Sequence, residues 1–140
     1  MSPNLVPASA RAKADIRLPA GLSLDVVEAA LRDGLRRLEG ITWRIIQAYP
    51  PTYTAPEEEI VRRTVAAAAE VLGEAPVVNM RVGASDARLY RMAGIPSVVF
   101  GCTPFNMGGP DEHVFIDDVT AVAQVHALAA FDFLAARGMG

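Results

Sequence analysis

The stretch from Ala75 to Gly101, APVVNMRVGASDARLYRMAGIPSVVFG, decides the expected fold. It contains two short apolar runs, residues 77–80 and 97–100, that lack alternation between polar and apolar positions. Such runs are typical of parallel strands covered by helices on both faces. Between them, Ser85 and Asp86 can cap a short helix. The stretch therefore predicts a strand–helix–strand unit of an α/β protein.

Longer helices flank this unit along the chain. Thr54 and Glu57 stand at capping-box spacing, which predicts a helix over residues 54–72. A final apolar helix is predicted over residues 117–137. Together with the central unit, these helices predict that residues 56–140 form a partial three-layer α/β sandwich.

The N-terminal third has a different pattern. Residues 12–18 alternate between apolar and polar side chains, which is typical of a half-buried strand. Ser23 is a good N-cap for a helix that reaches about Leu38. Residues 41–49 are rich in β-branched and aromatic residues and are predicted to form a second strand. Residues 1–55 are therefore expected to form a separate β-α-β unit.

Composition excludes several classes of protein. The net charge is −3, so no basic surplus exists to drive nucleic-acid binding. The chain has one cysteine, which fits a reducing cytoplasm and excludes an internal disulfide framework. No run reaches the ~18 apolar residues of a membrane span, and no signal-peptide pattern is present. We expect a cytoplasmic protein without nucleic-acid or membrane partners.

Two loops carry the candidate chemistry. Residues 81–88 follow a predicted buried strand and open a helix, where a glycine and first-turn amides suit an anion such as a carboxylate. A capped helix with nothing bound explains the same pattern equally well. Residues 101–113 are rich in functional groups, but Asp111, Glu112 and His113 are consecutive, which is poor geometry for three ligands of one metal.

Two further side chains have plainer interpretations. Cys102 follows an apolar run and is expected to be a packed residue at a strand end rather than a nucleophile. His126 is expected to be a core histidine or a helix histidine whose hydrogen bonding is satisfied. The chain also lacks a phosphate-binding loop, a dinucleotide fingerprint and the common zinc-binding motifs.

Three runs of the sequence, in order, resemble the M20 family of zinc amidohydrolases and peptidases, of the acetylornithine deacetylase and succinyl-diaminopimelate desuccinylase type. The resemblance covers essentially the whole chain. The matching runs are Asn4–Pro7 with Ala14–Arg17, then Gly83–Arg88 with Gly94–Pro96 and Phe100–Gly101, and last Pro110–Asp118.

The resemblance implies an α/β catalytic domain interrupted by a ferredoxin-like lid that commonly dimerises. The chain would then begin midway through the lid, with residues 1–55 as its β-α-β half. Members of the family hydrolyse amide bonds of N-acyl amino acids or small peptides with two zinc ions and a glutamate base. Most of those ligands and the base belong to an N-terminal half, so this chain is expected to be inactive alone, and a homo-oligomer.

The resemblance also assigns residues that contact the substrate carboxylate. These are Asn4 and Arg17 of the lid and Gly83, Ala84 and Ser85 of the loop. A planar guanidinium such as that of Arg17 suits bidentate binding of a carboxylate. Arg17 is equally consistent with an exposed arginine on the polar side of its strand. No catalytic residue is assigned within the chain.

The resemblance leaves the metal ligands within this chain unassigned. Gly108 occupies the position of a family zinc histidine and has no side chain to donate. Asn106, Glu112 or His113 would have to compensate, although His113 matches a family tyrosine. The alternative to part of a hydrolase is a non-catalytic module that binds a small anion or drives oligomerisation.

Overall fold

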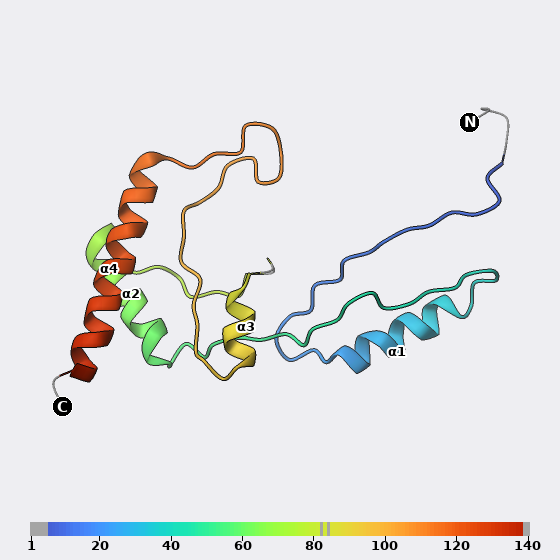
Figure 1. Ribbon diagram of the computed structural model, residues 1–140, viewed down its shortest axis with the longest axis horizontal. Coiled ribbons are helices and arrows are strands. Elements are labelled where there is room, and N and C mark those ends of the chain that lie inside the picture. The colour runs from blue at the N-terminus through green and yellow to red at the C-terminus, as the bar shows by residue number, and fades with distance from the viewer. Residues whose placement is uncertain (1–5, 82, 84, 139–140) are drawn as a thin grey trace.

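The chain is described by a computed structural model that covers residues 6–81, 83 and 85–138. Helices and extended connections make up this part of the chain, with the first helix and its flanking segments on one side and the others on the opposite side (Figure 1). The helices are α1 (Leu24–Leu35), α2 (Glu59–Leu72), α3 (Ala87–Met92) and α4 (Ile116–Gly138).

The predicted α/β sandwich and β-α-β lid are wrong, because no sheet forms among the described residues. The segments 12–18, 41–49, 77–80 and 97–100 carry no strand. The only strand-like pairing among the described residues is an isolated antiparallel bridge between Phe105 and His113. Strand-like patterns favour an extended backbone, but a sheet also requires a neighbouring segment in hydrogen-bonding register.

The helices were largely predicted from their end signals. The Ser23 hydroxyl accepts the Val26 amide at 3.4 Å and caps α1, which ends earlier than expected. Gly73 ends α2 in a left-handed conformation with φ of 80°, as glycine readily does. The predicted cap by Thr54 is wrong, since α2 begins after Glu58 without a side-chain cap.

Helix α1 belongs to an open arm of the molecule. None of its residues is fully buried. Its contact with the following segment includes the Arg32 guanidinium, 5.7 Å from the centre of the Trp43 ring. Arg32 also pairs with Glu28 on the same helix at 2.6 Å. Figure 1 shows this arm apart from α2 and α4. The predicted domain boundary between residues 55 and 56 stays a prediction.

The core lies between α2 and α4. Ala67 and Ala68 of α2 pack against Val125 and Ala129 of α4, and all of them are buried. Small residues let the two backbones approach closely. Arg137 near the end of α4 lies 3.6 Å from Glu59 at the start of α2, so the helices run antiparallel.

This core is small for the size of the chain. The accessible surface is 11405 Å², whereas a compact monomer of 14.9 kDa exposes about 7,000 Å². Much of the excess is apolar: Ile46 is 67% exposed and Val77 is 83% exposed. The chain therefore exposes more apolar surface than is usual for a compact monomer of its mass.

Helix α4 has an apolar face that α2 leaves uncovered. Ile116, Val119, Phe131 and Leu134 are 83%, 49%, 69% and 67% exposed. By length and composition α4 would pass as a membrane span, contrary to the expectation from sequence, although core helices of soluble proteins share this property. Its packing on α2 accounts for one side only. The expected absence of a membrane partner stays a prediction.

Candidate functional site

The structure describes part of the predicted carboxylate site. Asn4 and Ala84 lie outside the described residues. Arg17 is exposed, and its Nη2 lies 2.5 Å from a carboxylate oxygen of Asp15. This surface pair leaves the arginine accessible, and exposed pairs contribute little to stability. Arg17 is therefore open to a ligand that displaces Asp15.

A contact joins the segment of Arg17 to the segment that leads to the loop. The Ala20 amide donates to the sulfur of Met80 at 3.3 Å. Beyond Met80, a β-carbon built on Gly83 would meet nothing within 4 Å. Space is therefore available beside the Gly83 backbone. The roles proposed for Arg17, Gly83 and Ser85 stay predictions.

Backbone contacts connect the loop to α3. The Arg88 amide donates to the Ser85 carbonyl at 3.2 Å, whereas Asp86 makes no side-chain cap. The Arg88 guanidinium lies 5.0 Å from the centre of the Tyr49 ring. Its buried Nε has no hydrogen-bond partner in the described part of the chain. Arg88 belongs to the sequence motif at residues 83–88, but no sequence pattern predicts its contact with Tyr49.

The loop after residue 101 is organised by its own side chains. Phe105 and His113 exchange two backbone hydrogen bonds, and their rings stack with centres 5.3 Å apart. Phe115 packs edge-on against Phe105 at 4.9 Å. His113 Nδ1 lies 2.7 Å from the Asp111 carbonyl oxygen. A carbonyl oxygen only accepts, so Nδ1 carries the proton in this contact and neutral His113 keeps a lone pair on Nε2.

Gly108 has a structural role in this loop. Its φ of 74° is left-handed, a conformation that glycine adopts without strain. Its amide donates to the Glu112 carboxylate at 3.2 Å. Glu112 therefore stabilises the turn of its own loop.

The described residues do not fit a zinc centre. No group of three or more histidine, cysteine, aspartate or glutamate side chains converges within the described ranges. Asp111 contributes its backbone carbonyl to His113, and Glu112 contacts Gly108. Compensation for Gly108 by Asn106, Glu112 or His113 would take a single ligand and stays a prediction. A zinc ion would need ligands from elsewhere.

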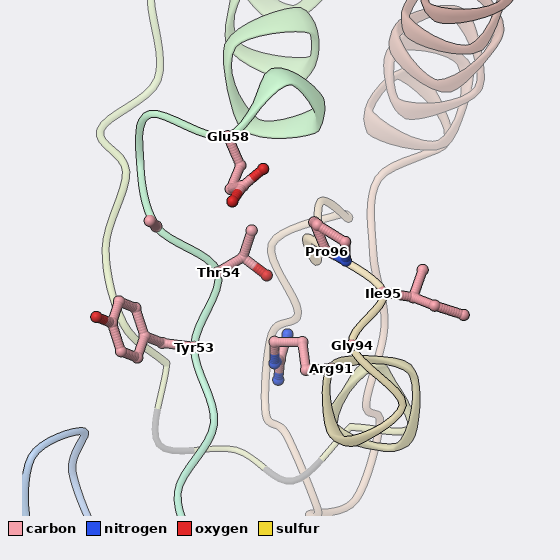
Figure 2. Close-up of a pocket in the computed structure, with 8 residues that line it drawn as sticks. Tyr53, Thr54, Glu58, Arg91, Gly94, Ile95 and Pro96 are labelled. Carbon is pink, nitrogen blue, oxygen red and sulfur yellow. The ribbon is translucent and has the colours of Figure 1, made fainter.

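A different group of polar contacts lies between α2 and α3. The Arg91 guanidinium donates from Nε to the Thr52 hydroxyl at 3.0 Å and from Nη1 to the Ser97 carbonyl at 3.1 Å. Thr54 also bonds to Ser97. These contacts border a hollow of about 330 Å³, with Arg91 at one end and Glu58 towards the other (Figure 2). The sequence analysis did not identify Arg91, because a single arginine in a short helix matches no functional motif.

The structure also describes His126 and Cys102, for which the sequence suggested structural roles. His126 Nε2 lies 2.9 Å from the Phe100 carbonyl oxygen, so the prediction of a satisfied helix histidine is confirmed. Cys102 is a free, half-buried thiol. No strand precedes it among the described residues, so its predicted place at a strand end is wrong.

The chain matches the model of a known protein family. The family model described as Peptidase family M20/M25/M40 matches residues 8–132, most of the chain. No solved structure gives a significant match. The family match spans Arg17, the loop at residues 83–85, and Gly108.

Proposed function

Because the chain belongs to the peptidase family M20/M25/M40, we propose that it is the substrate-binding portion of a metal-dependent hydrolase. Its substrates would be N-acyl amino acids or small peptides, as for enzymes of the acetylornithine deacetylase and succinyl-diaminopimelate desuccinylase type. The match over residues 8–132 is the observation that carries the proposal. A cytoplasmic location and a homo-oligomeric state are parts of the same proposal.

The substrate carboxylate is proposed to bind Arg17 and the loop at Gly83 and Ser85. Arg17 supports this because it is exposed and, among the described residues, pairs with Asp15 alone. Open space beside Gly83 supports close approach of a ligand to the backbone. A carboxylate that replaced Asp15 would keep a charge-assisted pair with the guanidinium.

Zinc and the general base are proposed to come from a second polypeptide segment. In this family, zinc supplies a Lewis acid that activates water. The described part of the chain lacks a converging ligand set, so this chain's share would be to bind and orient the substrate. The large exposed apolar surface gives such a segment an area on which to pack. The chain alone is therefore expected to be inactive.

A second candidate is a non-catalytic module that binds a small anion or drives oligomerisation. The uncovered apolar face of α4 favours it, because isolated helices that expose such a face tend to associate. This candidate predicts a defined oligomer without any added polypeptide.

The test combines metal content, turnover and binding on the purified chain. We expect no stoichiometric zinc and no hydrolysis of N-acetyl or N-succinyl amino acids. N-acetyl-L-leucine should nevertheless bind, and Arg17→Met should weaken that binding about tenfold, while Arg11→Met should leave it unchanged. Stoichiometric zinc with turnover would refute the need for a second segment. Equal binding by both variants would refute the carboxylate site.

A further inference from the structure

The hollow between α2 and α3 carries an inference that is independent of the proposed hydrolysis. It measures about 330 Å³, near the lower end of the roughly 300–1,000 Å³ typical of small-molecule sites. It is lined by Thr54, Pro96 and the charged residues Glu58 and Arg91, whereas Figure 2 shows the side chains of Tyr53 and Ile95 pointing away from it. None of these residues belongs to the predicted carboxylate site.

Arg91 is held in place at one end of the hollow. Its Nε and Nη1 donate to Thr52 and to the Ser97 carbonyl, at 3.0 Å and 3.1 Å. Its Nη2 has no hydrogen bond to the described part of the chain, and neither acceptor carries a charge. The guanidinium is therefore fixed in position, and no carboxylate of residues 6–81, 83 or 85–138 lies within 4.0 Å to neutralise its charge. A fixed guanidinium loses little entropy when it binds an anion.

Glu58 supplies the opposite charge. It is exposed and makes no cap hydrogen bond at the start of α2. No ion pair joins it to Arg91 within the described residues, although both line the same hollow. Figure 2 shows Thr54 and Pro96 between them, with the guanidinium at one end and the carboxylate towards the other.

We propose that this hollow binds a free α-amino acid as its zwitterion, with the ligand carboxylate on Arg91 and its ammonium on Glu58. A simple anion would gain the contact with Arg91 but be repelled by Glu58, and a simple cation would meet the reverse. A ligand that carries both charges satisfies both residues.

The test uses L-leucine as the probe, with the full chain and calorimetry or equilibrium dialysis. N-acetyl-L-leucine lacks the ammonium and L-leucinamide lacks the carboxylate, so both should bind this hollow at least about fivefold more weakly. Glu58→Gln should weaken L-leucine binding about fivefold, whereas the neighbouring Glu57→Gln should not. Far-UV circular dichroism establishes that the variants keep their helices.

Further variants separate this hollow from the carboxylate site. Arg91→Lys retains a charge but loses the fork that holds Thr52 and Ser97, so L-leucine binding should weaken. Repeating the titrations in the Arg17→Met background removes the proposed carboxylate site, so the L-leucine binding that remains there reports on this hollow. The proposal is overturned if L-leucine does not bind, if Glu58→Gln binds it as tightly as Glu57→Gln, or if L-leucinamide binds equally well. Because no metal or turnover is involved, failure here leaves the proposed hydrolase function untouched.

Discussion

The hydroxyl of Thr54 and the backbone of Ser97 bind each other in both directions. Oγ1 donates to the Ser97 carbonyl at 2.6 Å and accepts the Ser97 amide at 3.0 Å. A hydroxyl can do both because it carries one proton and two lone pairs. The Arg91 guanidinium donates to the same carbonyl at 3.1 Å. These bonds join the segment before α2 to the segment after α3.

Thr54→Val should therefore destabilise this junction. Valine keeps the shape of threonine but leaves the Ser97 amide without its partner, which costs about 1–3 kcal/mol. Hydrogen exchange at the Ser97 amide and a urea titration followed by circular dichroism measure the effect. Thr54→Ser retains the hydroxyl and is the control. Equal protection of the Ser97 amide in both variants would contradict this role.

The packing of α2 on α4 gives a second prediction. Val125 has no exposed surface in the core between the helices, whereas Val119 on the same helix is 49% exposed. Val125→Ala should lower the free energy of unfolding by roughly 1–3 kcal/mol, through lost burial and a residual cavity. Val119→Ala removes the same atoms from a half-exposed site and should cost less than about 0.5 kcal/mol. Similar losses in the two variants would show that this core does not hold the helices together.

The sequence predicted helices better than it predicted their assembly. Ser23 and Gly73 act at helix ends, where local hydrogen bonds and backbone freedom decide the outcome. Thr54 misled because its hydroxyl has a long-range partner in Ser97, and no local pattern reports such a partner. The apolar runs at residues 77–80 and 97–100 misled for the same reason, since pairing depends on segments far away in sequence.

The candidate site shows the same limit. Motif resemblance led to Arg17, Gly83 and Ser85, and the family match covers them. It could not reveal Arg91, whose importance comes from its contacts with Thr52 and Ser97. Such contacts join segments distant in sequence and follow only from the folded chain.

Gly108 gives a third prediction. Its φ of 74° would strain any residue with a β-carbon, at a cost of about 1–2 kcal/mol. Gly108→Ala should open the turn, which proton exchange at the Gly109 amide would detect, since that amide donates to Asn106 at 2.8 Å. Gly101→Ala is the matched control, because a β-carbon there meets nothing within 4 Å and no left-handed φ is required. Unchanged protection in Gly108→Ala would refute a structural reason for glycine at this position.

The uncovered face of α4 gives the last prediction. Phe131 and Leu134 are 69% and 67% exposed and lie one helical turn apart. If this face is where another polypeptide or a second copy packs, replacing both with serine removes most of the apolar area that drives association. The double variant should bind less of a hydrophobic dye and sediment as a smaller species than the unaltered chain.

Gln124→Ser is the control for that measurement, because it changes an exposed polar residue of the same helix and should alter neither the dye signal nor the sedimentation. Phe133 is avoided, since its ring lies 4.0 Å from the Arg137 guanidinium and contributes to the helix end itself. Helix content measured by circular dichroism must stay constant across the variants, because α4 retains its buried contacts through Val125 and Ala129. If the double variant keeps the association state of the unaltered chain, the contact surface lies elsewhere, and the exposed arm around α1 becomes the next face to alter.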